Sequence, residues 1–491
     1  MPSAVLDHQT HSGSGITKFT NCTLIKGNDL VEEDLWISSV TGKIIHSQEV
    51  FYEQRMIPDR IIDLGGRIVS PGFIDVQFNG AYGFDFSVLP EDGISAYGKG
   101  VLRVNKNLIK TGVTSYLPTI TSQRSEVYHK VCQVSALTAP ASTQTHTQRE
   151  RDQILTSAHQ ALPFLAPSGA RRDPSTGSES LGAHCEGPFI NPTKNGIHNI
   201  SVLRTAPNGL ADLAACYGER NLTSPSPIKL LTLAPELPGA LSCISALTSL
   251  DITAAIGHSE ATYEEARAGI AAGATTITHL FNAMRPLHHR NPGIFGLLGT
   301  ASPSPSSTPT GTRAAQKPFF GLIADGIHLH PTSVKIAWNA HPDGCVLVTD
   351  AMSLVGLPDG TYDWTNGSRI VKAGPLLTLE GSDGKIAGSC IELVECVTNF
   401  LNWSGASVPE AVRAVTATPA RMLGLERVKG TLEAGADADI VVLELESDEN
   451  GGRRLEVDQV WKFGEMVFEK GVEGEECTNG VGNDVGNGGE N

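Results

Sequence analysis

The sequence predicts an α/β protein: a (β/α)₈ barrel of the TIM type, with a small β-sandwich domain built from both ends of the chain. Three observations predict this fold. Eight short apolar runs alternate with helix-like segments along the chain, as in successive βα units of a parallel sheet. Strand-like segments flank this region on both sides. Finally, 40% of the 491 residues are hydrophobic and 18% are charged, which is ordinary for a globular chain with a large core.

The N-terminal part of the chain is expected to form short strands. Four segments of strand character, punctuated by Gly and Asn, lie at 18–25, 34–38, 43–46 and 60–64. Strand character returns near the other end of the chain, at 430–443 and 457–470. We therefore expect residues 17–70 and 426–470 to form one discontinuous β-domain, with the barrel inserted between its two halves.

The barrel is predicted over residues 71–425. Its strands would be the eight apolar runs at 73–78, 113–120, 181–185, 228–233, 252–256, 275–278, 319–324 and 345–349. Helices are expected at 263–272 and 331–340 between strands, and at 392–403 and 408–423 after the last strand. Eight such units fit a closed barrel better than an open, doubly wound sheet.

Three segments differ in composition from the rest of the chain. Residues 137–180 contain Ser, Thr, Pro and Gln clusters, and residues 301–317 are nearly all Ser, Pro, Thr, Gly and Ala. Residues 471–491 carry five acidic residues and no Lys or Arg. Such sequences cannot bury a core, so we expect two solvated insertions and a disordered acidic tail.

The charge balance limits the class of partner. The chain has 37 Lys and Arg against 53 Asp and Glu, a formal net charge of −16. This balance argues against nucleic-acid binding and against a polybasic membrane surface. Residues 1–20 lack the apolar core of a signal peptide, and no apolar run is long enough to cross a bilayer. Nine scattered cysteines without a CxxC pair indicate reduced thiols, so we expect a cytoplasmic protein.

Four chemically useful side chains directly follow predicted barrel strands. They are Glu186, His258, His279 and Asp350. The carboxyl ends of barrel strands meet at one mouth, where the active sites of such barrels lie. Two imidazoles and a carboxylate suit a catalytic Zn²⁺ with a position left open for water, and Asp350 would then act as general base. A single His or Asp at a strand end is more often a cap, an ion-pair partner or a core polar group, but four such residues at corresponding positions favour a metal site.

Several longer motifs occur in order between residues 71 and 443. They are PGFIDVQFNG (71–80), HCEGPFIN (184–191), GIHN (196–199), GHSEAT (257–262), THLFNAM (278–284), IADGIH (323–328), LVTDA (347–351) and IAGS (386–389). Each is weak alone, but together they are specific. On these motifs the chain resembles the amidohydrolase superfamily, and within it the N-acetylglucosamine-6-phosphate deacetylases.

The resemblance implies a metal-dependent hydrolase of amino-sugar metabolism that removes the acetyl group from N-acetyl-D-glucosamine 6-phosphate. It implies that Glu186, His258 and His279 are metal ligands, that Asp350 is the catalytic carboxylate, and that His198 polarises the acetamide carbonyl. The sugar phosphate would be held by Asn282, Ala283, Arg290 and His328, with further substrate contacts from Ile197, Ile386, Ala387, Gly388 and Ser389. A homodimer is also expected, in which Arg290 could serve the neighbouring subunit.

The first predicted strand carries an informative difference from the wider superfamily. Many amidohydrolases have a His-x-His pair there that binds a second metal, whereas this chain has Gln77 and Asn79. Neutral amides are poor ligands for zinc, so we expect one divalent metal ion per chain, with zinc as the expected metal. The two amides could contact a bound water or a metal ligand, or could merely hydrogen-bond inside the barrel mouth.

Two other functions are compatible with parts of this pattern. A cyclic amidase or a deaminase of the same superfamily would use the same metal ligands, but it would not require the phosphate set of Asn282, Arg290 and His328. A barrel that has lost catalysis and acts as a scaffold would be expected to lack ligands, and this chain retains all of them.

Overall fold

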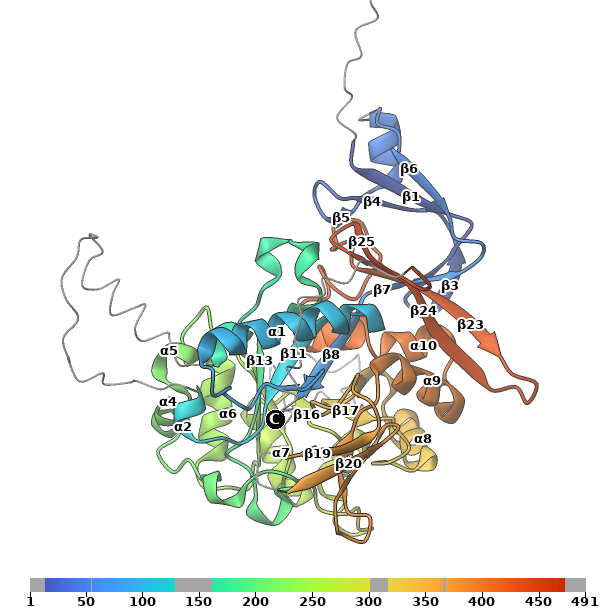
Figure 1. The fold of residues 1–491 in the computed structure, drawn as a ribbon. Helices are drawn as coiled ribbons and strands as arrows, with labels where there is room; N and C mark the ends of the chain where they lie inside the picture. Colours follow the sequence, from blue (N-terminus) through green and yellow to red (C-terminus); the bar gives the residue numbers. More distant parts are fainter. Residues whose placement is uncertain (1–13, 54, 129–160, 301–316, 365–367, 473–491) are drawn as a thin grey trace, which may run out of the picture.

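The computed structural model describes residues 14–53, 55–128, 161–300, 317–364 and 368–472. They form a barrel with a smaller β-domain against one end (Figure 1). The predicted acidic tail lies outside the described residues from position 473 onwards, as do most of the two predicted insertions. The described part of the first insertion is not solvated as expected, because Leu162 and Leu165 are fully buried against the barrel.

All eight predicted barrel strands are confirmed. They are β8 (Phe73–Phe78), β11 (Val113–Ile120), β13 (Ala183–Glu186), β14 (Ile228–Leu233), β15 (Thr253–Ile256), β16 (Thr276–Ile277), β17 (Phe319–Ile323) and β18 (Cys345–Val348). They pair in parallel in this order, and the short β12 (Glu179–Ser180) adds to β11. A bridge between Phe78 and Ala351 joins the first strand to the end of the last and so closes the ring.

Helices surround this barrel (Figure 1). They are α1 (Ile94–Leu108), α2 (Ser125–Tyr128), α4 (Leu210–Tyr217), α5 (Glu219–Leu222), α6 (Ala240–Ser249), α7 (Tyr263–Ala272), α8 (Pro331–Ala340), α9 (Leu393–Ser404), α10 (Val408–Arg413) and α11 (Ala417–Met422). A capping box of Thr262 and Glu265 begins α7 where the sequence predicts. The single helix predicted over 408–423 is two, because Thr416 has a non-helical backbone and Pro419 has no N–H to continue the first helix. No helix within the described ranges combines the length and apolar composition that a bilayer span requires.

The β-domain consists of two packed sheets. One contains β1 (Ile16–Thr20), β4 (Leu35–Ser38), β5 (Lys43–Ile44) and β6 (Arg60–Asp63); the other contains β2 (Thr23–Lys26), β3 (Asp29–Glu32), β7 (Ile68–Pro71), β23 (Ile440–Ser447), β24 (Arg453–Lys462) and β25 (Glu465–Glu469). Buried Phe19, Ile37, Ile440 and Trp461 belong to the core between them. Because β7 pairs with β23, the two ends of the chain share one sheet, as the sequence predicts.

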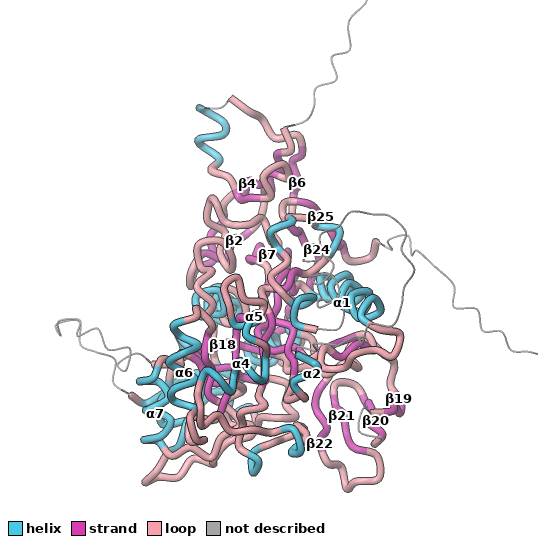
Figure 2. Tube along the Cα trace, turned by 90° about the vertical axis from the view of Figure 1, so that its left-hand side faces the viewer, coloured by secondary structure: helices cyan, strands magenta, loops and turns pink. Residues whose placement is uncertain are grey.

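A four-stranded antiparallel sheet follows the last barrel strand and was not predicted from the sequence. It consists of β19 (Gly360–Asp363), β20 (Arg369–Ala373), β21 (Leu376–Leu379) and β22 (Ile386–Ser389). Figure 2 shows it beside the barrel, at the end away from the β-domain. Its strands are short, and each contains at most two buried residues, so they offer little of the apolar alternation by which strands are predicted. This sheet forms one wall of the pocket described below.

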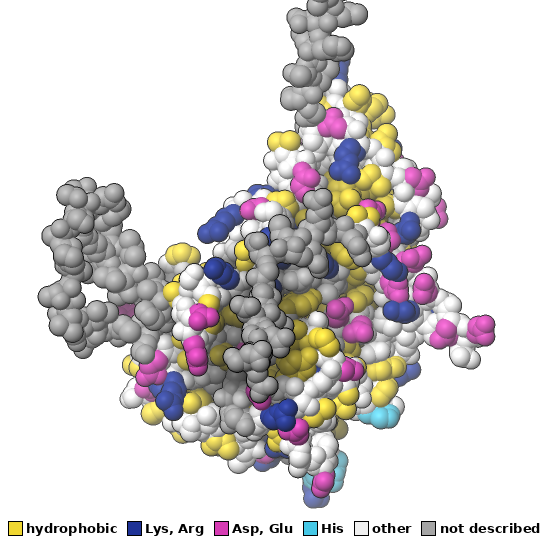
Figure 3. All heavy atoms as spheres, viewed as in Figure 1, with side chains coloured by type: hydrophobic (Ala, Val, Ile, Leu, Met, Phe, Trp, Pro, Cys, Tyr) yellow, Lys and Arg dark blue, Asp and Glu magenta, His cyan; other side chains and the backbone are white. Residues whose placement is uncertain are grey.

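Shorter elements complete the described chain. They are β9 (Gly80–Ala81), β10 (Phe84–Asp85), the π-helical turn η1 (Glu49–Glu53), and the 3₁₀ turns η2 (Ile109–Thr111), η3 (Leu162–Leu165), η4 (Gly169–Arg171), η5 (Pro174–Thr176), η6 (Pro192–Lys194), η7 (Ile200–Val202), η8 (Gly293–Gly299) and η10 (Pro342–Gly344). On the described part of the face drawn in Figure 3, basic side chains are scattered among acidic ones, in keeping with the acidic net charge.

A buried ion network joins the β-domain to the barrel. The Lys462 ammonium lies 3.0 Å from Glu179 Oε1 of the barrel and 2.8 Å from Asp439 Oδ2 of the β-domain. The Lys429 ammonium contacts the same two carboxylates and lies 2.8 Å from Asp437 Oδ2. Burial alone would raise the pKa values of Asp437 and Asp439, but the Lys429 charge outweighs it and holds both below their usual range. The three carboxylates are close enough to suggest a cation site, and the two ammonium groups fill it.

Replacement of Glu179 by Gln tests this network. The change leaves two buried ammonium groups without their shared barrel partner, so we expect the free energy of unfolding to fall by about 3–5 kcal/mol. Urea denaturation at pH 7 measures the change, with the exposed Glu426→Gln as a matched control expected within about 0.5 kcal/mol of wild type. Asp437 and Asp439 have pKa values below their usual range when folded, so their contribution to stability is complete above about pH 4 and is lost on further acidification. Equal stabilities of wild type and Glu179→Gln at pH 7 would contradict the role of the network.

Candidate active site

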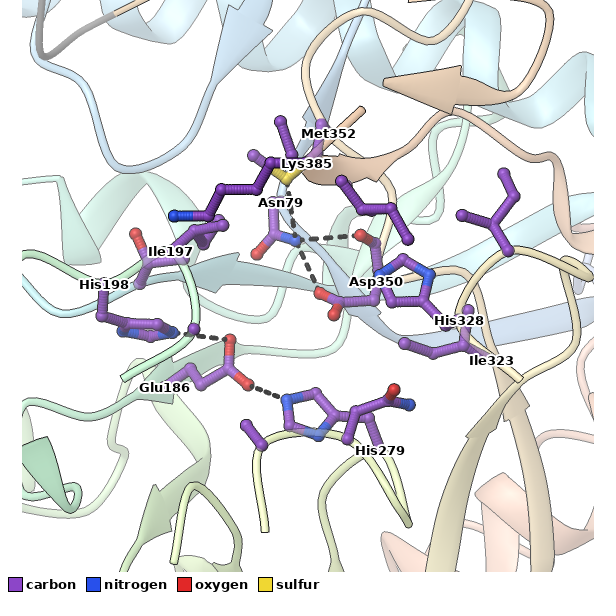
Figure 4. Close-up of a pocket in the computed structure, with 18 of the residues that line it drawn as sticks. Asn79, Glu186, Ile197, His198, His279, Ile323, His328, Asp350, Met352 and Lys385 are labelled. Carbon is purple, nitrogen blue, oxygen red and sulfur yellow. Dashed lines mark hydrogen bonds and ion pairs between the residues drawn. The ribbon is translucent and has the colours of Figure 1, made fainter. Parts of the chain in front are cut away.

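A pocket of about 570 Å³ opens at the carboxyl ends of the barrel strands (Figure 4). All four residues that the sequence places after barrel strands line it: Glu186, His258, His279 and Asp350. His198, on the loop after β13, joins them. The side chains of these five residues, far apart in the sequence, therefore face one space.

The backbone at the strand ends turns these side chains inwards. His258, His279 and Asp350 have positive φ angles of 48°, 24° and 48°. Such left-handed conformations are strained for residues other than glycine and concentrate at functional sites. Gly257 assists the turn, because a Cβ at this position would lie 2.7 Å from Thr278 Cβ. The strained backbone conformations thus occur at the positions where they direct His258, His279 and Asp350 into the pocket.

Three ligand-type atoms converge on one point. Glu186 Oε1 lies 3.2 Å from His258 Nε2 and 3.0 Å from His279 Nε2, and the two nitrogens are 3.0 Å apart. Ligand atoms on a tetrahedral Zn²⁺ lie about 3.3 Å apart, since each bond is about 2.0–2.2 Å. The spacing of the three atoms therefore fits a small divalent ion.

The hydrogen-bond partners of the site support the same fit. His258 Nδ1 lies 2.7 Å from the Lys194 carbonyl, which can only accept, so the ring proton is on Nδ1 and the Nε2 lone pair faces Glu186. Burial lowers the pKa of His279, but the Glu186 carboxylate outweighs it and raises that pKa to about 9. Burial alone would raise the pKa of Glu186, and hydrogen bonding from His198 and His279 helps to hold it well below its usual range. The ligand-type atoms of Glu186, His258 and His279 are thus arranged to bind a positive ion between them.

The amides of the first barrel strand contact the acidic residues of the site. Gln77 Nε2 donates to Glu186 Oε1 at 2.9 Å, and Asn79 Nδ2 donates to Asp350 Oδ1 at 2.7 Å. Burial and the nearby Glu186 charge raise the pKa of Asp350 to about 6. Asp350 is therefore poised to exchange a proton near neutral pH, and Asn79 orients the carboxyl that does so.

His198 presents a proton to the pocket. The Ser122 backbone N–H donates to His198 Nδ1 at 3.0 Å, so a neutral ring carries its proton on Nε2. That nitrogen faces the pocket, 3.6 Å from Glu186 Oε2. His198 can thus donate a hydrogen bond to a bound oxygen. His184, two residues before Glu186 on β13, is fully buried and hydrogen-bonds to Thr232 Oγ1 at 2.8 Å.

The residues that the resemblance assigns to the substrate are mostly brought together. The pocket is lined by Ile197, Asn282, Ala283, His328, Ile386, Ala387 and Gly388. His328 is held by Asp325, whose Oδ2 lies 2.6 Å from Nδ1. Ser389 is fully buried behind the wall, and Arg290 is exposed on the loop after β16; neither lines the pocket.

The pocket also contains residues that sequence reasoning missed. Lys385, Trp364, Ile370 and Leu379 line it from the unpredicted sheet β19–β22 and its loops, and Met352 from the segment after β18. No motif marks them, because their place depends on how that sheet folds over the barrel mouth. The adjacent IAGS motif is the one signal that pointed to this region.

Comparisons with known proteins agree with this geometry. The Amidohydrolase family model matches residues 228–467. The chain is 40% identical over 456 residues to the N-acetylglucosamine-6-phosphate deacetylase of Bos taurus, covering 92% of this chain and 96% of the relative. It is 38% identical over 463 residues to the Homo sapiens enzyme of the same name, covering 94% and 98%.

A solved structure matches as well. It is that of an N-acetyl-D-glucosamine-6-phosphate deacetylase variant from Mycobacterium smegmatis in complex with N-acetyl-D-glucosamine-6-phosphate. The TM-score is 0.65 at 26% identity, covering 93% of this chain and 99% of that chain. With the metal-type cluster, the barrel and relatives this similar over nearly their whole length, the chain belongs to the N-acetylglucosamine-6-phosphate deacetylase family of the amidohydrolase superfamily.

Proposed function

We propose that this protein hydrolyses N-acetyl-D-glucosamine 6-phosphate to D-glucosamine 6-phosphate and acetate, a step in amino-sugar breakdown. The observation that carries the proposal is the convergence of Glu186, His258 and His279 beside Asp350 and His198 in one pocket. Membership in the deacetylase family supports the choice of substrate.

The proposed cofactor is one divalent metal ion per chain, with zinc favoured by two imidazoles and a carboxylate. Glu186, His258 and His279 would hold it. A bound ion of this kind lowers the pKa of water to about 7 and polarises a carbonyl. The single-metal stoichiometry is supported by Gln77 and Asn79, whose amide groups are engaged with Glu186 and Asp350.

The proton steps follow from the side chains themselves. Asp350 would accept a proton from the attacking water as the water adds to the acetamide carbon. His198 Nε2–H would donate a hydrogen bond to the developing oxyanion. Asp350 would then return its proton to the amine as the C–N bond breaks. Asn79 keeps the Asp350 carboxyl in one orientation throughout, through its 2.7 Å hydrogen bond.

The phosphate end of the substrate would lie against Asn282, Ala283 and His328. Arg290 is exposed and does not line the pocket of its own chain, so we propose that it acts in a homodimer, at the site of the neighbouring subunit. We also propose a cytoplasmic location, supported by seven buried free cysteines among the described residues.

A substrate panel tests the proposal directly. Acetate release would be measured with purified protein on N-acetylglucosamine 6-phosphate, N-acetylgalactosamine 6-phosphate and unphosphorylated N-acetylglucosamine, and ring opening would be measured on a cyclic amide such as dihydroorotate. We expect the highest kcat/KM on N-acetylglucosamine 6-phosphate. Turnover of the cyclic amide alone would overturn the proposal.

Replacement of Asp350 by Asn should abolish turnover while metal content and fold remain. The ligand set is complete without Asp350, and an Asn there can still accept the hydrogen bond from Asn79. It cannot accept the water proton, so kcat should fall by at least about 10²- to 10⁴-fold with little change in KM. The control is Asp363→Asn, a carboxylate that is 96% exposed. Near-normal kcat in a metal-replete Asp350→Asn protein would contradict the mechanism.

Elemental analysis should find one tightly bound divalent ion per chain. Replacement of His258 or His279 by Ala removes one of three ligands and should strip both metal and activity. His46→Ala, which changes an exposed histidine of the β-domain, should retain both. Two stoichiometric metals in the wild-type protein would show that Gln77 and Asn79 do not prevent a second site.

The role of Arg290 can be tested by subunit complementation. Arg290→Ala should lower kcat/KM on the 6-phosphate substrate about 10- to 150-fold, the range of a charge-assisted bond, with a smaller loss on N-acetylglucosamine. Co-refolded mixtures of Arg290→Ala and Asp350→Asn chains should show a higher kcat/KM on the 6-phosphate substrate than either variant alone, because mixed dimers contain one intact composite site. A monomeric mass in solution, or no recovery in mixed dimers, would refute action across the interface.

A further inference from the structure

One pocket residue carries a charge that the proposed function has not used. Lys385 directly precedes β22, in the hairpin loop that joins β21 to β22. Among the described residues that line the pocket, it is the one lysine or arginine. Its ammonium has no hydrogen-bond or ion-pair partner within the described part of the chain, although its backbone N–H donates to Ser382 Oγ at 3.1 Å.

The side chain extends across the pocket. In Figure 4 the Lys385 side chain extends above Asn79, and its ammonium points towards the side of the pocket on which Ile197 is labelled. Ile197 and Ile386 are 49% and 45% exposed, so the mouth is apolar where the lysine stem crosses it. A flexible stem over apolar surface with a solvated charged end is the usual arrangement of a lysine that reaches for an anion.

The other charged groups of the pocket do not balance the negative charge of a phosphorylated substrate. A phosphate monoester brings close to two negative charges at neutral pH. The pocket already contains the carboxylates of Glu186 and Asp350, and a divalent ion would balance only these two. Asn282 and Ala283 offer neutral donors, and the His328 ring faces the Asp325 carboxylate at 2.6 Å. The whole chain carries −16, so its long-range field also opposes an anionic substrate.

We propose that Lys385 is a specificity-determining residue, whose ammonium draws the phosphate of the substrate into the pocket and holds it from within the same chain. This inference rests on the proposed deacetylase function and deepens it. It assigns part of the selectivity for the phosphorylated sugar to the sheet β19–β22, separately from any contribution of Arg290.

Steady-state kinetics of four proteins test the inference: wild type, Lys385→Met, Lys385→Arg and Lys372→Met. Lys372 is the matched control, a lysine of the same sheet that pairs with Asp359 at 3.1 Å and does not line the pocket. Each protein would be assayed on N-acetylglucosamine 6-phosphate and on N-acetylglucosamine. Inorganic phosphate would serve as a competitive inhibitor in the same assays.

Lys385→Met should lower kcat/KM on the 6-phosphate about 10-fold or more, the lower end expected for one charge-assisted contact, mainly through KM. Its kcat/KM on N-acetylglucosamine should stay within about 2-fold of wild type. Inhibition by inorganic phosphate should weaken in parallel, and Lys385→Arg should restore most of both. Raising the salt concentration should reduce wild-type preference for the phosphorylated sugar more than that of Lys385→Met.

Equal losses on the two substrates, or no loss on either, would overturn the inference. Because Lys385 is exposed on a hairpin, Lys385→Met should remain folded, and its intact rate on N-acetylglucosamine reports this directly. A loss of the same size in Lys372→Met would also overturn it, since general surface charge would then suffice. Failure of the proposed function is distinguishable, because in that case the wild-type protein would release acetate from neither sugar.

Discussion

The buried carboxylate of Glu186 is the constraint on which the active-site half of the molecule depends. It is 2% exposed, and a carboxylate without water is stable only when positive charge and hydrogen-bond donors replace the water. His258, His279 and Gln77 approach one oxygen at about 3 Å, and His198 faces the other. To bring them there, the backbone after β15 and β16 adopts strained left-handed conformations, which persist only because the packed barrel holds them.

The β-domain is connected to this constraint through the first barrel strand. β7 pairs with β23 in the β-domain and continues within two residues into β8, which carries Gln77 and Asn79. The Gly72 N–H between these strands donates to the Asp439 carbonyl at 2.8 Å, beside the buried lysines. The network of Lys429 and Lys462 therefore holds the segment from which the amides reach Glu186 and Asp350. The ion network is therefore coupled to the site through the first barrel strand, although it does not lie at the pocket.

In the proposed function, chemistry and selectivity are divided between two structural layers. The strand ends of the barrel carry the metal-type cluster and Asp350, and neighbouring barrel loops carry Asn282 and His328. The sheet β19–β22 covers one side and contributes Trp364, Ile386 and Lys385. This separation lets the covering sheet change what enters the pocket while the reacting groups stay fixed by barrel packing, which is typical of barrel enzymes.

The sequence by itself determined the barrel, its eight strands and the residues at their carboxyl ends. Apolar-rich runs such as 113–120 and 228–233, which alternate with helix-like segments, favour buried strands of βα units, and the polar residues after such strands then lie at the barrel mouth. Tertiary structure alone decided what lies around that cluster. The strands of β19–β22 are short, with a few buried residues such as Leu377 among exposed ones, and the places of Lys385, which lines the pocket, and of Arg290, which does not, depend on how separate segments pack. The local sequence determines whether its own segment is buried. A pocket wall that is shared by distant segments is determined by contacts that form only in the folded chain.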